Sequence, residues 1–138
     1  MIPQQNEPKS PVALVFWVLW FAILNGLVII QFFVGGGIPK GADHGKPPVL
    51  FLAIAAGLAL VALGIRFVLI PQIKEVPKKL PAMIIGLALS EAIGFVGMFA
   101  VGREFPATQL LLFSSAIGCI LCFAPVYAKV ENEDGRFR

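Results

Sequence analysis

The chain has 138 residues, of which 58% are hydrophobic and 14% are charged, and its formal net charge is +3 at pH 7. Soluble domains carry about 25% charged residues, so this composition excludes an ordinary soluble fold and predicts a single integral membrane domain over residues 1–138. The positive charge is too small and too dispersed to indicate nucleic-acid binding. The first apolar segment is too long for the core of a cleaved signal peptide, and we expect none.

Four apolar segments are long enough to cross a bilayer as helices, which takes about 20 residues each. They cover residues 12–34, 49–70, 80–101 and 107–128. Junctions rich in glycine and proline separate them. None of the segments alternates with a period of two, which favours helices over barrel strands. The sequence therefore predicts an all-α integral membrane fold, a four-transmembrane-helix antiparallel bundle.

The basic residues outside these spans predict the orientation of the bundle, because cytoplasmic loops are enriched in lysine and arginine. The richer side holds Lys9, Lys74, Lys78, Lys79, Lys129, Arg136 and Arg138, and the poorer side holds Lys40, Lys46 and Arg103. Both termini are therefore predicted to be cytoplasmic (N-in/C-in) in a multi-pass protein of the inner (plasma) membrane. Arg66, one turn from the cytoplasmic end of the second span, is expected to reach the interface as an anchor.

The first span and the loop after it contain the next features along the chain. Trp17 and Trp20 lie in the inner half of the span, and tryptophan is typical of the membrane interface. The loop at 35–48 is rich in glycine and contains Asp43 and His44. Two potential ligands are fewer than the three or four that a metal site uses, so we interpret this loop as a flexible turn and expect no metal.

Small residues recur along the third span at the spacing of one helical turn. They are Ala82, Gly86, Ser90, Gly94 and Gly97. The second span offers Gly57 and Gly64 in the same manner. Helices in lipid associate where small residues let their backbones approach closely. We therefore predict that the second and third spans pack as an antiparallel hairpin through these residues.

Glu91 is the one acidic residue in the apolar segments. An ionisable group at bilayer depth is costly and usually functional. Four polar residues fall near the same depth, namely Asn25, Ser90, Ser114 and Ser115. We hypothesise a polar cluster at the bilayer centre, in which an amide or a hydroxyl group donates a hydrogen bond to Glu91, and we treat all five as candidate ion- or proton-binding residues. A protonated glutamate that only joins two helices is the alternative.

The segment around this glutamate resembles a known ion-carrying helix. Residues 84–95 read IIGLALSEAIGF, which is similar to the second helix of subunit c of rotary ATP synthases, where a glutamate carries a proton or a sodium ion. The resemblance implies that Glu91 is the carrier and Ser90 its neighbour. The chain as a whole also resembles uncharacterised four-span bacterial membrane proteins.

Cys119 and Cys122 form a Cys-x-x-Cys pair in the fourth span. Vitamin K epoxide reductases are four-helix proteins with such a pair in a transmembrane helix, and the resemblance implies thiol- or quinone-linked redox chemistry. The alternative is that both thiols pack as small apolar groups.

Three functions are compatible with these features. The first is a small non-enzymatic membrane protein that acts through assembly, as a homo-oligomer or as an accessory subunit of a larger membrane complex. The second is a proton- or sodium-translocating subunit that uses Glu91, and the third is a membrane oxidoreductase. We expect membrane lipid around the protein, no nucleic-acid partner and no cofactor.

Overall fold

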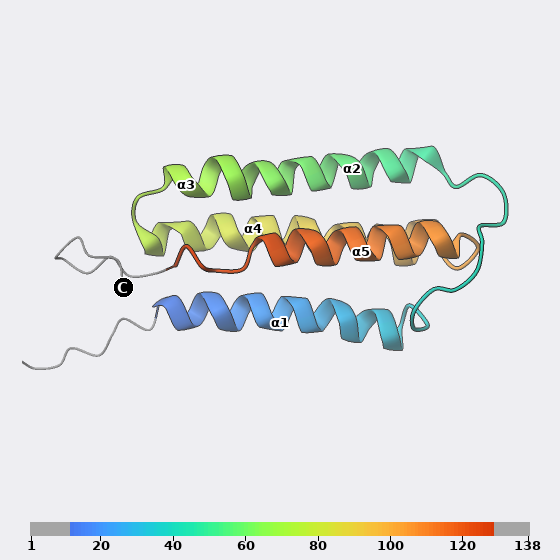
Figure 1. The fold of residues 1–138 in the computed structure, drawn as a ribbon, viewed down its shortest axis with the longest axis horizontal. Helices are drawn as coiled ribbons and strands as arrows, with labels where there is room; N and C mark the ends of the chain where they lie inside the picture. The colour runs from blue at the N-terminus through green and yellow to red at the C-terminus, as the bar shows by residue number, and fades with distance from the viewer. Residues whose placement is uncertain (1–11, 129–138) are drawn as a thin grey trace, which may run out of the picture.

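A computed structural model describes residues 12–128 of the chain (Figure 1). These residues form helices and no strand. Four of the basic residues used to predict the orientation, Lys9, Lys129, Arg136 and Arg138, lie outside this range.

Three of the four predicted spans are confirmed as helices long and apolar enough to cross a membrane. The first is α1 (Val12–Phe33). The second combines α2 (Val49–Gly64), a π-helical turn η1 (Ile65–Leu69) and α3 (Ile70–Gln72). The third combines α4 (Val76–Phe95) with a second π-helical segment, η2 (Val96–Val101).

The third span begins four residues before the predicted start at residue 80. Its first turn contains Pro77, and proline is tolerated there because the first amide groups of a helix have no partner within it. Pro81 lies inside the helix, which continues on both sides of it. Pro77, which lies before the predicted start, is therefore part of the helix.

The fourth helix, α5 (Pro106–Cys122), is shorter than the predicted span at 107–128. Its 17 residues cover about 25 Å, less than the roughly 30 Å of a bilayer core. Pro125 explains the early end, because it has no amide hydrogen for the next helical bond and disfavours helical backbone in the residue before it. Residues 123–128 instead form turns, with the Val126 amide donating to the Ala124 carbonyl at 2.8 Å.

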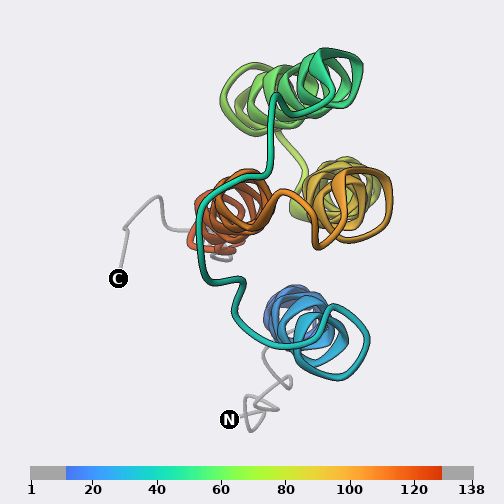
Figure 2. The same cartoon turned by 90° about the vertical axis from the view of Figure 1, so that its right-hand side faces the viewer.

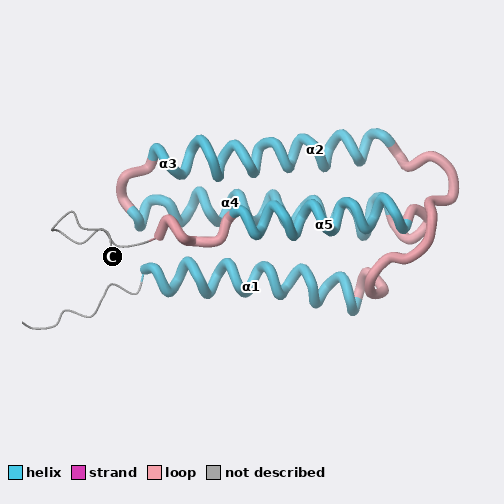
Figure 3. Tube along the Cα trace, in the orientation of Figure 1, coloured by secondary structure: helices cyan, strands magenta, loops and turns pink. Residues whose placement is uncertain are grey.

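The helices run antiparallel in succession, and the long first loop crosses one end of the bundle from α1 to α2 (Figure 3). The start of α1 and the end of the described chain lie at the same end (Figure 1). Viewed along the bundle, α4 and α5 lie side by side in the centre, with α2 on one side of this pair and α1 on the other (Figure 2). The contact between α4 and α5 is the most extensive, and that between α2 and α4 is next. The predicted contact between the second and third spans is therefore present.

The small residues of α4 meet other partners than predicted. Gly86 is covered by the ring of Phe123, and a Cβ built on Gly94 would lie 2.8 Å from Leu27 of α1. A Cβ on Gly97 would lie 3.1 Å from Leu112 of α5. The buried stripe, which includes Ala82 and Ser90, thus lies largely against α5 and α1.

Gly57 and Gly64 of the second span do not take part in this packing, contrary to the prediction. A Cβ built on either residue would meet no other group within 4 Å. The residues of α2 that are buried are Ala55 and Ala62. The buried face of α2 therefore carries these alanines and not the two glycines.

Candidate functional site

Glu91 lies on α4, in the interior of the 26-residue span Val76–Val101. At 1.5 Å per residue it is about 22 Å from Val76, which places it near the middle of the bundle. It is the one acidic residue within a helix of the part of the chain that the structure describes. This position makes Glu91 the leading candidate for a functional group.

The side chain of Glu91 occupies the border between two faces of α4. Leu87, one turn earlier, is fully buried, whereas its neighbour Ala88 is exposed. Phe95, one turn later, is half-buried like Glu91 itself. No hydrogen bond or ion pair within residues 12–128 uses the Glu91 carboxylate. The Glu91 carboxylate therefore has no polar partner among the described residues.

The predicted hydrogen-bonded cluster around Glu91 is not formed. Asn25 donates from Nδ2 to the Phe21 carbonyl at 2.7 Å. The Ser90 hydroxyl donates to the Gly86 carbonyl at 2.8 Å. Both side chains thus bond to the preceding turn of their own helix, a local arrangement that competes with bonds between helices.

The two serines of α5 do not reach Glu91 either. The Ser115 hydroxyl donates to the Leu111 carbonyl of its own helix at 2.8 Å, and Ser114 is exposed. Similar depth along the bundle does not by itself bring these residues together, because depth does not fix which face of a helix a residue occupies.

Arg66 contacts the end of α5 and makes no ion pair with Glu91. Its Nε donates to the Cys122 carbonyl at 2.5 Å, and its guanidinium lies 4.6 Å from the ring centre of Tyr127. A cation at a helix C-terminus compensates the partial negative charge of carbonyls without an intrahelical partner. Arg66 belongs to the π-helical turn η1, a type of turn that is frequent at functional sites.

Trp20 holds the same end of α5 from the opposite side. Its Nε1 donates to the Ile120 carbonyl at 2.8 Å, and its ring packs edge-on against Trp17 with 5.6 Å between centres. The sequence placed both tryptophans at the membrane interface. It could not reveal this hydrogen bond, because the two partners are 100 residues apart.

Asp43 fixes the first loop to the beginning of α5. Its Oδ1 accepts hydrogen bonds from the amides of Ala107 at 2.8 Å and Thr108 at 3.2 Å, and its Oδ2 accepts one from the Thr108 hydroxyl. The hydrogen bond from the Thr108 side chain is the main reason why the pKa of Asp43 is lowered. This part of the loop is anchored, which corrects its interpretation as a flexible turn.

The other candidate groups stand apart from Glu91. Cys119 is buried, Cys122 is exposed, and neither is in a disulfide. Residues 12–128 contain no group of three or more side chains that could hold a metal ion together.

Comparison with known proteins gives one informative similarity. No family model matches the chain, and no solved structure is significantly similar to it. The chain is 33% identical over 108 residues to the Na(+)/H(+) antiporter NhaA 2 of Novosphingobium aromaticivorans. The similarity covers 70% of this chain but 27% of that antiporter, so the chain spans about a quarter of the length of this relative. The resemblance to subunit c of rotary ATP synthases receives no support from these comparisons.

The structure and the similarity agree on the class of protein. Three helices have the length and composition of membrane spans, and the relative carries the name of a Na(+)/H(+) antiporter. This chain is therefore a helical membrane protein.

Proposed function

We propose that this protein takes part in ion transport across the membrane and that Glu91 is the group that binds and releases the proton or sodium ion. The similarity to a Na(+)/H(+) antiporter favours this function over the purely structural assembly that composition alone placed first. The observation that carries the proposal is the Glu91 carboxylate itself, which lies in mid-span without a hydrogen-bonding partner in the described chain.

The energetic argument concerns the cost of this position. A charged side chain at the bilayer centre costs about 2.5–3.5 kcal/mol on insertion scales and more in simulations, and such residues usually mark ion pathways or proton relays. If Glu91 served only to join two helices of this chain, its carboxylate would be expected to form a hydrogen bond with a neighbouring helix. The predicted partners for such a bond, Asn25, Ser90 and Ser115, each form a hydrogen bond within their own helix and not with Glu91.

The transport pathway requires more than one copy of this chain or a further subunit. Four helices with a core of packed apolar side chains leave no room for a conducting path along the bundle axis. Glu91 lies at the edge of the exposed face of α4, where a helix of another subunit can reach it. We therefore place the ion path between α4 and a neighbour, in a homo-oligomer or a larger membrane complex.

The orientation is part of the same proposal. The loop between α3 and α4 and the first turn of α4 lie at the end of the bundle that also holds the start of α1 (Figure 1). These segments contain Lys74, Lys78 and Lys79. By the positive-inside rule this end faces the cytoplasm, with the protein in the inner membrane.

Reconstituted liposomes test the role of Glu91 directly. We expect the wild-type protein to dissipate an imposed proton or sodium gradient and the Glu91→Gln variant to lose that flux. Glu104→Gln is the matched control, since Glu104 is exposed in the turn before α5, and it should retain the flux. Equal flux from the wild type and Glu91→Gln would refute the assignment.

A labelling experiment separates ion binding from assembly. A hydrophobic carbodiimide should modify Glu91 in the wild type, and sodium ions or low pH should change the rate of that modification if the carboxylate binds cations. Gel filtration of Glu91→Gln in detergent reports assembly independently. If the rate of modification does not change with sodium ions or with pH, and Glu91→Gln no longer forms the oligomer, then Glu91 serves assembly alone.

A further inference from the structure

The flank of α4 that carries Glu91 meets α1 at Gly94. Gly94 lies one helical turn after Glu91, and residues three apart on a helix have Cβ atoms about 5–6 Å apart. A Cβ built on Gly94 would lie 2.8 Å from Cδ1 of Leu27 on α1. Taken together, these two steps place a methyl group of Leu27 within about 9 Å of the Glu91 Cβ.

Three helices meet at Gly94. The Cβ position of this residue lies 3.5 Å from the Cβ atom of Ala116 on α5. Leu27 and Ala116 have no exposed surface, and Gly94 is buried as well. Interiors packed at this density contain few voids as large as a water molecule, so this layer closes one side of Glu91 to water.

Leu27 is also the buried side chain that holds the middle of α1. The other buried residues of α1 are Phe16 and Gln31. Phe16 packs edge-on against Tyr127 near the start of the helix, with ring centres 6.2 Å apart. Gln31 donates from Nε2 to the Gly37 carbonyl at 2.7 Å, near the end of the helix. The two ends of α1 are thus held by separate contacts, and Leu27 is the fully buried side chain between them.

The opposite side of Glu91 is open. At about 100° per residue, Gly94 and Ala88 lie about 60° to either side of Glu91 around the axis of α4. Gly94 is buried, whereas Ala88 is exposed and its side chain is a single methyl group. The carboxylate therefore has one closed side, against α1, and one accessible side.

We propose that Leu27 and Gly94 are positioning residues of the ion site, whose contact closes the α1 side of Glu91 so that ions reach the carboxylate over the open side at Ala88. The inference rests on the function proposed above, because it assigns the access route to the same carboxylate. Apolar constrictions exclude water and ions from membrane pathways in this way.

Two carbodiimides of different polarity measure this access in liposomes. A hydrophobic carbodiimide reaches Glu91 through the lipid, whereas a charged, water-soluble carbodiimide reaches it only where water does. Peptide mass spectrometry quantifies the modification at Glu91. The readout is the ratio of the water-soluble to the hydrophobic rate, because a change in the protonation of the carboxyl group affects both reagents alike.

Leu27→Ala removes the methyl groups that cover Gly94, so the ratio should rise about tenfold, which corresponds to about 1.4 kcal/mol. Gly94→Ala inserts a methyl group that must displace Leu27, so it should raise the ratio as well. In the double variant the added methyl group occupies space that the leucine leaves, and the ratio should return towards the wild-type value. Leu27→Val leaves a smaller gap and should raise the ratio in the same direction, which keeps the test valid if Leu27→Ala does not fold.

Gly97→Ala is the matched control. A Cβ there would lie 3.1 Å from the Cβ atom of Leu112 on α5, so the same substitution disturbs a contact with α5 and not the contact with α1. Its ratio should equal that of the wild type. An unchanged ratio in the Leu27 variants and in Gly94→Ala, or an equal rise in Gly97→Ala, would overturn the proposal.

Ion flux through the same liposomes separates this proposal from the function on which it rests. If Glu91→Gln retains its flux while Leu27→Ala raises the ratio, the function proposed above is wrong and the closed side of Glu91 is confirmed. If Glu91→Gln loses its flux while the ratio in Leu27→Ala is unchanged, Glu91 is the carrier and Leu27 does not control access to it.

Discussion

The aromatic ring of Phe123 occupies the space beside the backbone of Gly86 that any side chain at that position would need. Phe123 follows directly after the last residue of α5 and is fully buried. The close approach of the end of α5 to α4 therefore depends on the absence of a Cβ at Gly86.

Gly86→Ala is expected to destabilise the protein by about 1–3 kcal/mol, the usual cost of forcing extra atoms into a packed core. The measurement is reversible unfolding in mixed micelles, followed by tryptophan fluorescence. Gly57→Ala is the matched control, because a Cβ there meets open space, and its stability should equal or exceed that of the wild type. Equal stability of Gly86→Ala and Gly57→Ala would contradict the packing described here.

The hydrogen bond from Arg66 to the Cys122 carbonyl leads to a second prediction. Arg66→Met keeps most of the apolar stem but leaves the carbonyl without this donor. Removal of a hydrogen bond from a charged group costs about 1.5–3 kcal/mol. We expect faster amide hydrogen exchange in residues 120–128 of the variant, measured by mass spectrometry in detergent.

Arg103→Met provides the comparison for this experiment. Its single weak hydrogen bond reaches the Val34 carbonyl at 3.4 Å, at the other end of the bundle, so exchange in residues 120–128 should not change. If the two variants exchange alike in that segment, Arg66 does not hold the end of α5.

The carboxylate of Asp43 predicts a pH dependence of stability. Its pKa in the folded protein is lowered by the hydrogen bonds from Thr108 and Ala107, so folding favours the ionised form. The stabilisation is therefore fully present above the ordinary aspartate pKa of about 3.9 and is lost as the pH falls through the lowered value. Thermal unfolding of the wild type and Asp43→Asn should differ near pH 7 and converge in acid.

Thr108→Val tests the cause of this shift. The substitution removes the hydroxyl donor, which is the largest contribution to the lowered pKa, while the amide donors remain. The loss of stability on acidification should then be smaller in Thr108→Val and should be complete at a higher pH than in the wild type. An identical acid transition in the two proteins would show that the hydroxyl does not act on Asp43.

The helices were predictable because the apolar segments are long and proline and glycine separate them. The exceptions come from proline acting in two opposite ways. Pro77 falls within the first turn of α4, where the helix tolerates it, whereas Pro125 ends the helical path after α5. Pro77 lies before the predicted third span, whereas Pro125 lies inside the apolar run that predicted the fourth span.

The candidate site was only partly predictable. Glu91 stands out in the sequence because it is an acidic residue in an apolar segment, and this can be recognised without knowing the fold. The partners of a residue depend on how each helix is rotated about its axis. When all faces of a lipid-embedded helix are apolar, the spacing of residues in the sequence does not determine this rotation. For this reason Gly57 was assigned to the wrong face, and the hydrogen bond between Trp20 and Ile120 was missed.

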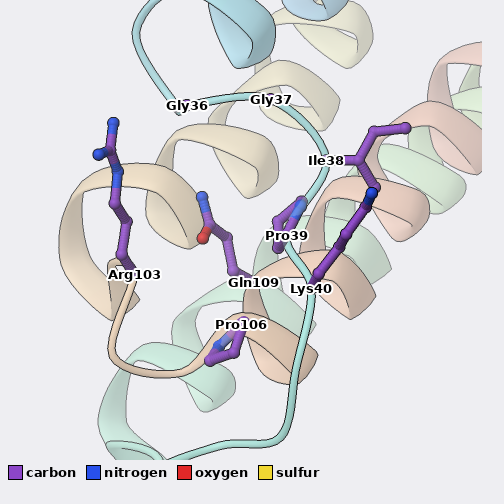
Figure 4. Close-up of a pocket in the computed structure, with 9 residues that line it drawn as sticks. Gly36, Gly37, Ile38, Pro39, Lys40, Arg103, Pro106 and Gln109 are labelled. Carbon is purple, nitrogen blue, oxygen red and sulfur yellow. The ribbon is translucent and has the colours of Figure 1, made fainter.

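The sequence did not predict the small cavity that Lys40, Arg103 and Gln109 line (Figure 4). Lys40 and Arg103 counted there only as charges on one side of the membrane, and Gln109 is an ordinary residue in the first turn of a helix. Their convergence arises from two connections far apart in the chain, which the order of residues alone cannot relate.

The widened turn at Ile65–Leu69 has a bearing on how the length of this protein can vary. Ala62 follows Ala55 by seven residues, and Ile70 follows Ala62 by eight, yet all three are buried. An i→i+5 turn accommodates one residue more than the regular helix around it. Homologues that lack a single residue within Ile65–Leu69 can therefore keep the helix on both sides of this turn facing inward, because the turn becomes an ordinary α-helical turn. A deletion earlier in α2 would instead rotate Ala62 away from its neighbours.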